Sequence, residues 1–193
     1  MRIAVAGTHF SGKTTLVRAL SERLPDHDAV DEPYLALFDG GYAMSDPPTL
    51  DDYAEQLATV SMLIEEYGEN AVFDRSPLDF LAYALTIQTG DFDLAQWRED
   101  CEPLMAELDL IVYCPIETPD RITVPLGESL KFRRRVDEKL RALLIEDTLD
   151  LVGDLTVIEV SGSVDERVEQ VLNALAALPG PRPRPRPSPE LDD

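Results

Sequence analysis

Residues 7–14 decide the fold, and they are Gly7-Thr8-His9-Phe10-Ser11-Gly12-Lys13-Thr14. They match the pattern G-x-x-x-x-G-K-[ST] at every fixed position. An apolar, strand-like run, Arg2 to Ala6, precedes them, and a segment with helical periodicity, Lys13 to Leu24, follows them. A glycine-rich turn between a strand and a helix lets backbone N–H groups approach an anion at the positive end of the helix dipole. The stretch therefore predicts a phosphate-binding loop, hereafter the P-loop.

The P-loop predicts that the chain binds a nucleoside triphosphate, and we expect ATP together with Mg²⁺. Lys13 is expected to reach the β and γ phosphates, and the Thr14 hydroxyl to ligate Mg²⁺. His9 and Phe10 occupy the free positions of the pattern, where shaping the loop is their expected task. The residues expected to bind the nucleotide are Gly7, Thr8, His9, Phe10, Ser11, Gly12, Lys13, Thr14 and Thr15.

The length and composition favour one domain. A chain of 193 residues with 44% hydrophobic residues is long enough to bury one sizeable core and short for two. We expect this domain over residues 1–178, followed by a tail, 179–193, in which proline and arginine alternate. Such a composition buries too little apolar surface to offset ordering, so we expect the tail to be disordered or extended.

The charge and the cysteines limit the possible partners. A formal net charge of −21 repels phosphate backbones and anionic lipid, so neither nucleic acid nor a membrane is expected as the main partner. Cys101 and Cys114 are too few for a disulfide framework, and no apolar run reaches the roughly 20 residues of a membrane span. The first residues resemble a strand more than a signal peptide. We expect a cytoplasmic protein.

Short apolar runs alternate with helical segments, which is typical of βαβ units. The pattern predicts an α/β protein with the P-loop NTP hydrolase fold, a mainly parallel sheet of about five strands flanked by helices. Strands are expected at 2–6, 29–30, 71–73, 110–113 and 156–160. Helices are expected between Thr49 and Gly68, from Ser76 to near Gly90, around 136–144, and over 164–178. Residues 93–108 also have a helical pattern, in which Pro103 should cause a break or a kink.

Two further groups of polar residues follow predicted strands. The carboxyl ends of parallel strands meet at one edge of a sheet, where ligands gather, so Asp74 and Arg75 should face the P-loop. Asp74 is a candidate to hold Mg²⁺ or orient water, and Arg75 to clamp a substrate or phosphate. The alternative is that Asp74 caps a turn and Arg75 pairs with a surface acid. Glu32 is a candidate to accept the proton of an attacking hydroxyl, although a carboxylate without a role is common among 38 acidic residues.

A basic cluster stands out in this acidic chain. Six cationic residues lie within eleven positions, namely Lys131, Arg133, Arg134, Arg135, Lys139 and Arg141. A mobile lid could bring one guanidinium over the triphosphate, where it would neutralise developing charge. The alternative is an exposed helix with pairs four residues apart, such as Arg134 with Glu138. Arg121 competes for the same role, so Arg121 and Arg134 are both candidate catalytic residues.

Five segments carry a family resemblance: AGTHFSGKTTL (6–16), DEPY (31–34), VFDRSPLDFLAYA (72–84), IVYCPIETPDRI (111–122) and VDEKLRALL (136–144). In them the chain resembles the NadR-like group of small AAA/P-loop ATPases, which includes nicotinamide riboside kinase domains and is related to deoxynucleoside kinases. The resemblance implies a nucleoside-kinase-like fold with ATP on the P-loop and a substrate near Glu32 and Arg75. It also implies a lid carrying Arg121 or one of Arg133 to Arg135, and an adenine near the turn 161–163.

Two functions fit these observations. One is a kinase that transfers the γ-phosphoryl group of ATP to a nucleoside-like hydroxyl of a small-molecule acceptor. The other is a regulatory ATPase whose output is a conformation and which makes no phosphorylated small molecule. A pocket beside the γ-phosphate built from Glu32, Arg75 and Asp79 would distinguish the two. The residues around Glu32 and Arg75 favour the kinase.

Overall fold

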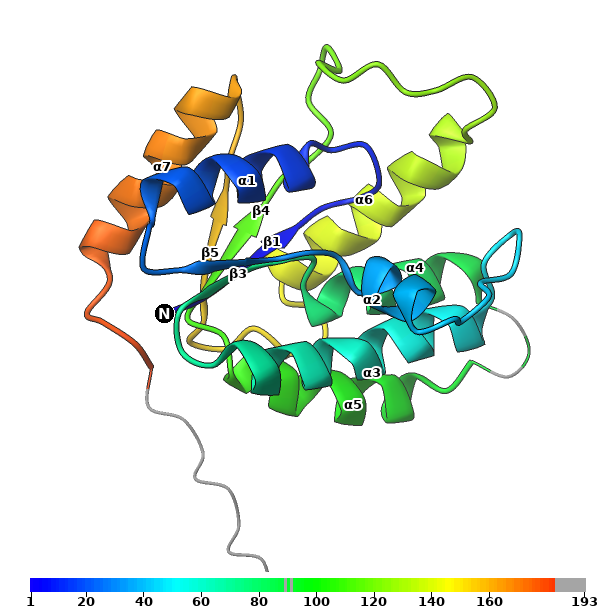
Figure 1. The fold of residues 1–193 in the computed structure, drawn as a ribbon. Helices are drawn as coiled ribbons and strands as arrows, with labels where there is room; N and C mark the ends of the chain where they lie inside the picture. The colour runs from blue at the N-terminus through cyan, green and yellow to red at the C-terminus, as the bar shows by residue number, and fades with distance from the viewer. Residues whose placement is uncertain (89, 91, 183–193) are drawn as a thin grey trace, which may run out of the picture.

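A parallel five-stranded sheet with helices on both faces forms the centre of the protein (Figure 1). The computed structural model describes residues 1–88, 90 and 92–182, so most of the expected tail lies outside the described residues. The strand order is β2-β3-β1-β4-β5, and every neighbouring pair is parallel. The strands are β1 (Arg2–Ala6), β2 (Asp28–Val30), β3 (Ala71–Asp74), β4 (Leu110–Tyr113) and β5 (Thr156–Glu159). The expected fold class is confirmed.

Seven helices in the described residues cover the two faces. Two of them, α1 and α7, pack together on one face, and α3 to α6 cover the other (Figure 1). None of these helices is long and apolar enough to cross a membrane. The helices are α1 (Lys13–Arg23), α2 (Pro33–Asp39), α3 (Leu50–Tyr67), α4 (Pro77–Ile87), α5 (Leu94–Ala106), α6 (Leu130–Leu144) and α7 (Val164–Ala177).

The alternation of side chains along β1 explains the two layers. Successive residues of a strand point to opposite faces of the sheet, and all five residues of β1 are buried. Ile3 and Val5 belong to the core under α1 and α7, together with Leu16, Leu20, Val168 and Val171. Ala4 and Ala6 belong to the larger core on the other side. Burial on both faces holds β1, and with it the start of the P-loop, at the centre of the molecule.

Local signals set the ends of α3. The Thr49 hydroxyl accepts the backbone N–H of Asp52, and the Asp52 carboxylate accepts that of Thr49, which is a capping box. The helix stops at Gly68, whose φ of 67° suits glycine far better than other residues. Both boundaries confirm the expectation from the sequence.

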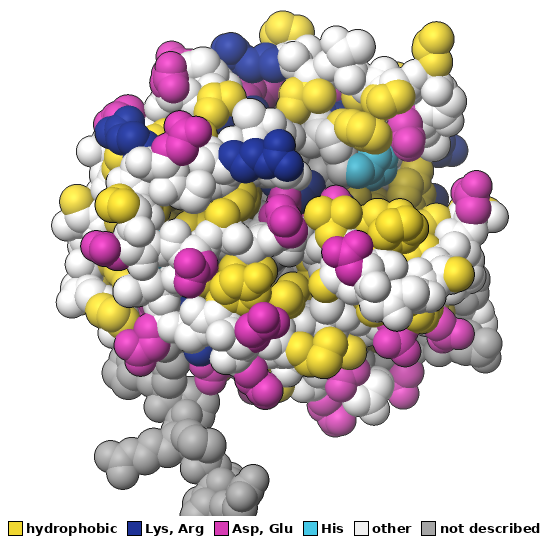
Figure 2. Space-filling model, viewed as in Figure 1, with side chains coloured by type: hydrophobic (Ala, Val, Ile, Leu, Met, Phe, Trp, Pro, Cys, Tyr) yellow, Lys and Arg dark blue, Asp and Glu magenta, His cyan; other side chains and the backbone are white. Residues whose placement is uncertain are grey.

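Two elements differ from the expectation. The helix α5 continues through Pro103, so the break does not occur. Proline removes one backbone hydrogen bond, but Cys101, Leu104 and Met105 around it are buried and hold the helix against the core. The sequence pattern does not predict the short helix α2. It begins at Pro33 and exposes Phe38 among other apolar side chains, and Figure 2 shows exposed hydrophobic side chains interspersed with acidic ones on this side of the molecule.

The larger core should dominate stability. Leu81 of α4 is 0% exposed, so Leu81→Ala leaves a cavity and is expected to lower the free energy of unfolding by about 2–5 kcal/mol. Met62 of α3 is 61% exposed, so Met62→Ala should change it by less than about 1 kcal/mol. Urea denaturation of both variants measures the difference. Equal effects of the two substitutions would contradict this account of the core.

Candidate active site

The P-loop begins where β1 ends, and two of its residues must be glycine. A Cβ atom at Gly7 would lie 2.5 Å from Ser11 Oγ and 2.7 Å from the carbonyl oxygen of Cys114. Gly12, just before α1, has φ 89° and ψ 15°, a left-handed conformation that side chains disfavour. Phe10 also has a positive φ, 55°, which is uncommon for a non-glycine residue. The turn is therefore held in a strained shape by its surroundings.

This turn presents several free backbone N–H groups. Within the described part of the chain, the N–H groups of Phe10, Ser11 and Gly12 donate to no acceptor. The N-cap residue of α1 is Gly12, which has no side chain to cap the helix, and the first N–H groups of any helix lack partners inside the helix. Several unpaired N–H groups at a helix N-terminus form a binding site for an anion such as phosphate.

Lys13 lies inside the turn. Its side chain is buried, and Nζ donates a hydrogen bond of 2.9 Å to the carbonyl oxygen of Thr8. Burial lowers the pKa of Lys13 to about 8, and the nearby Arg75 cation acts in the same direction. A bound phosphate would supply the negative charge that this buried ammonium group lacks.

Thr14 and Asp74 meet next to the turn. Thr14 Oγ1 donates a 2.5 Å hydrogen bond to Asp74 Oδ2. Asp74 is 3% exposed, and its buried Oδ1 has no hydrogen-bond partner among the described residues. Burial raises the pKa of Asp74, whereas Lys13 and the Thr14 hydroxyl oppose the rise.

The Thr14 hydroxyl and the Asp74 carboxylate are suitable ligands for a magnesium ion. A hydroxyl and a carboxylate are ligands that Mg²⁺ prefers, and the unpaired Oδ1 leaves one lone-pair site open. No group of three or more His, Cys, Asp or Glu side chains in the described ranges could hold a metal. Magnesium at this place would therefore complete its coordination with phosphate and water, as it usually does.

Arg75 extends the site away from the P-loop. Its Nε donates a 2.9 Å hydrogen bond to Glu32 Oε2, and its guanidinium lies 5.5 Å from the centre of the Tyr83 ring. Its φ of 94° is again left-handed. The expected neighbours Glu32, Asp74 and Arg75 thus lie at one edge of the sheet, and the surface acid that pairs with Arg75 is Glu32 itself.

Asp79 lies beside Arg75, with its Oδ1 3.6 Å from Arg75 Nη1. It is 0% exposed, so it supports the site and does not line an open pocket. Its Oδ1 accepts the N–H of Gly7 at 3.0 Å, and its Oδ2 accepts the N–H and the hydroxyl of Ser76. The sequence Ser76-Pro77-Leu78-Asp79 at the start of the helix predicts the contact between Asp79 and Ser76. Nothing in the sequence predicts the contact between Asp79 and Gly7. Asp79 joins the start of the P-loop to the start of α4.

The sequence did not identify Tyr83 as a site residue, because nothing in the sequence distinguishes it from the other buried residues of α4. The backbone N–H of His9 donates to the Tyr83 hydroxyl at 2.9 Å, and His9 Nδ1 lies 3.0 Å from the same oxygen. Tyr83 also stacks on Tyr53, with ring centres 5.0 Å apart. Burial, followed by the cations Arg75, Lys13 and Arg133, lowers the pKa of His9 to about 4. His9 is therefore neutral at physiological pH.

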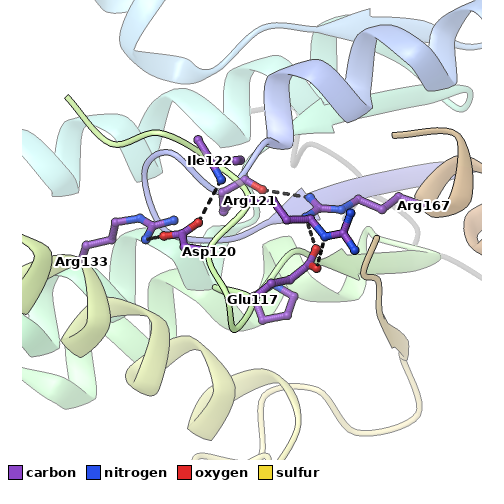
Figure 3. A pocket seen from close by; sticks show the side chains of 8 residues that line it. Glu117, Asp120, Arg121, Ile122, Arg133 and Arg167 are labelled. Carbon is purple, nitrogen blue, oxygen red and sulfur yellow. Dashed lines mark hydrogen bonds and ion pairs between the residues drawn. The ribbon is translucent and has the colours of Figure 1, made fainter. Parts of the chain in front are cut away.

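Two buried arginines contact the P-loop, Arg133 of α6 and Arg167 of α7. Arg133 Nε and Nη2 donate to the carbonyl oxygens of His9 and Phe10 at 3.0 and 2.8 Å. Arg167 Nη1 donates to that of Ser11 at 2.9 Å. Each guanidinium also pairs with an acid between β4 and α6, Arg133 with Asp120 and Arg167 with Glu117, and a small pocket lies between the two pairs (Figure 3).

The other expected lid arginines form no hydrogen bond to the P-loop within the described residues. Arg121 is exposed and bonds to Glu117 at 2.8 Å, and Arg134 is exposed on α6. Arg135 donates to the carbonyl oxygen of Thr86. Among the cluster 131–141, Arg133 alone forms a hydrogen bond to the P-loop within the described residues. Sequence reasoning missed Arg167 altogether, because a lone arginine in an amphipathic helix carries no distinguishing signal.

The alternative of an exposed, self-paired helix is not observed either. No Arg134–Glu138 pair forms in the part of the chain that the structure describes, and Asp137 and Arg141, also four residues apart, have other partners. Asp137 instead accepts the Tyr113 hydroxyl at 2.9 Å, and Arg141 pairs with Glu159. The turn 161–163, expected near an adenine, is tied to Glu117 through the N–H of Gly162.

Comparison with known proteins agrees with this geometry. A family model described as an AAA domain matches residues 2–167. No curated protein sequence gives a significant match. Deoxyadenosine kinase from M. mycoides with bound dATP superposes with a TM-score of 0.65 at 18% identity, over 92% of this chain and 100% of that one.

Two other solved structures are similar. The NadR protein in complex with NR has a TM-score of 0.66 at 20% identity, over 97% of this chain but 51% of the NadR chain. Thymidylate kinase from Candida albicans has a TM-score of 0.61 at 16% identity, over 91% of this chain and 90% of that one. At such identities the likeness shows the fold, which this chain shares with P-loop nucleoside and nucleotide kinases.

The lowered pKa of His9 predicts acid sensitivity. The folded protein protonates His9 only near pH 4, whereas the unfolded chain does so near pH 6.5, so stability falls as the pH drops through this interval. Between pH 7 and 5 the loss due to His9 should be about 2 kcal/mol. His9→Asn removes the titration, so its unfolding free energy, measured in urea, should fall less than that of the wild type over this range. Parallel pH profiles would contradict the prediction.

Proposed function

This chain belongs to the AAA-domain family, whose model covers residues 2–167, and from this premise we propose that it is an ATP-dependent small-molecule kinase. It transfers the γ-phosphoryl group of ATP to a hydroxyl of a nucleoside-like acceptor. We assign this activity to one domain, residues 1–178. The observation that carries the proposal is the Arg75–Glu32 ion pair, which lies directly beside the Thr14–Asp74 contact of the P-loop.

Two consecutive residues divide the site into a nucleotide side and an acceptor side. Asp74, the last residue of β3, contacts Thr14, and Arg75 contacts Glu32 at the start of α2. The left-handed backbone at Arg75 accompanies this change of direction. A phosphoryl donor on the P-loop and an acceptor at Glu32 would therefore be neighbours, as in-line transfer requires.

The charges support the same division. Burial lowers the pKa of Lys13 and raises that of Asp74, and the negative charge of Glu32, which is close enough to act on both groups, favours the protonated form of each. The Glu32 side chain is 30% exposed, which leaves it accessible to an acceptor. We assign it the role of receiving the proton from the attacking hydroxyl.

The other residues position the reactants. Gly7 to Thr15 hold the phosphates of ATP, with Lys13 beside the β and γ phosphates. Thr14 and Asp74 hold Mg²⁺, which when bound neutralises negative charge on the phosphates. Arg75 orients the acceptor or its neighbouring phosphate. Arg121 and Arg134 remain the proposed sources of a mobile guanidinium, because their side chains are exposed.

A nucleoside-like acceptor suits the surroundings of Glu32 and agrees with the neighbours. Tyr34 and Phe38 of α2, which begins directly after Glu32, are exposed and stack with ring centres 6.2 Å apart, and aromatic surfaces bind flat rings. The similar solved structures contain dATP and NR, so we propose an acceptor of that chemical class.

The substitution Glu32→Gln tests the kinase activity. It removes the proton acceptor at nearly constant size, so phosphotransfer should fall by about 10²- to 10⁴-fold while ATP affinity is retained. Phosphorylated product and free phosphate are measured in parallel, with ATP and a panel of nucleosides and vitamin precursors. Glu65→Gln, at an exposed position of α3, makes the same charge change and should behave as the wild type.

A different result would identify a regulatory ATPase. In that case no acceptor of the panel is phosphorylated, and phosphate is released at the same rate by the wild type and by Glu32→Gln. Nucleotide binding at the P-loop would then persist without the proposed transfer.

The metal site has its own test. Asp74→Asn keeps the shape of the side chain but loses the negative oxygen, so half-maximal turnover should need about 10- to 100-fold more Mg²⁺. Turnover is titrated with Mg²⁺ at saturating ATP, and Glu65→Gln again serves as the control. An unchanged titration would mean that Asp74 only orients the Thr14 hydroxyl.

A further inference from the structure

Four successive carbonyl groups of the P-loop accept hydrogen bonds from cationic side chains. The carbonyl of Thr8 accepts from Lys13, those of His9 and Phe10 accept from Arg133, and that of Ser11 accepts from Arg167. Arg133 and Arg167 come from α6 and α7, which lie on opposite faces of the sheet (Figure 1). The loop is thus held from both sides.

Because the peptide group is planar, these contacts also fix the directions of the neighbouring N–H groups. A trans peptide is planar, so the carbonyl of one residue and the N–H of the next point in opposite directions. Holding the carbonyls of residues 9, 10 and 11 therefore directs the N–H groups of residues 10, 11 and 12 away from the arginines. None of these three N–H groups has an acceptor within the described residues.

We propose that Arg133 and Arg167 are positioning residues, which hold the P-loop carbonyls outward so that its N–H groups converge on a phosphate. The inference rests on the proposed nucleotide binding and adds a role for two residues. Position 133 requires an arginine, because the planar guanidinium spans two successive carbonyl groups. The single ammonium group of a lysine cannot do this.

The geometry separates this role from that of a lid arginine. Both side chains are buried, 2% exposed for Arg133 and 6% for Arg167. The remaining guanidinium nitrogen atoms are also engaged, that of Arg133 with Asp120, and those of Arg167 with Glu117 and the carbonyl of Gly162. Since each positive charge already has a carboxylate partner (Figure 3), the two arginines act on the phosphate mainly through the shape of the loop.

The test uses a ligand that reaches only the loop. Calorimetry on the full chain measures the affinity of Mg-ATP and of magnesium tripolyphosphate for the wild type, Arg133→Met and Arg133→Lys, each well below its melting temperature. Both variants should bind both ligands about 10-fold or more weakly, and lysine should not restore the affinity. Arg98→Met, at an exposed position of α5, makes the same charge change as Arg133→Met and should bind like the wild type.

Several results would overturn the inference. Affinity restored by Arg133→Lys would indicate a direct contact with phosphate, and a loss for ATP but not for tripolyphosphate would indicate a contact with the nucleoside. A lower melting temperature with unchanged affinities would indicate a structural role alone. If Arg133→Met does not fold, Arg167→Lys replaces it, with the same expected loss for both ligands.

The wild type distinguishes this inference from the proposed function. If it binds neither ligand, the proposed nucleotide binding fails, and the inference fails with it. If it binds both and the variants bind equally well, the inference alone fails.

Discussion

The backbone of the P-loop has more polar groups than its own turn can satisfy, and the rest of the site is organised around them. Free N–H groups must face the anion, so the other N–H groups and the carbonyls need partners elsewhere. Asp79 accepts the N–H of Gly7, and Tyr83 accepts that of His9. Lys13, Arg133 and Arg167 take the carbonyls. A short turn of eight residues thus depends on α4, α6 and α7.

This arrangement also explains how an acidic protein can offer an anion site. The net charge of −21 opposes a phosphate at long range, and three of the arginines near the turn are paired, with Glu32, Asp120 and Glu117. Local attraction must therefore come from oriented N–H groups, the start of α1 and Lys13. At such a site the orientation of the N–H dipoles matters more than the total charge of the protein, because these dipoles act at the short distance at which the phosphate binds.

Several elements of the protein lie where its sequence predicts them. Thr49 and Asp52 cap α3, Gly68 ends it, and β1 is buried as its apolar residues indicated. Asp74 and Arg75 meet the P-loop because parallel strands end at the same edge. Pro103 did not break α5, since the buried contacts of the helix outweigh one lost hydrogen bond. The helix α2 was missed because its mainly exposed, short sequence has no clear periodicity.

The sequence by itself determined the P-loop, the strands and most helix ends, because each depends on residues within a few positions of one another. Only the tertiary structure decided which arginine reaches the loop. Arg133 and Arg134 are adjacent, but one step along a helix turns the side chain by about 100°, which buries the first and exposes the second. The contacts of Arg133 with His9 and of Arg167 with Ser11 span 124 and 156 positions. Such contacts exist only once α6 and α7 have packed on opposite faces of the sheet, and no local pattern encodes that packing.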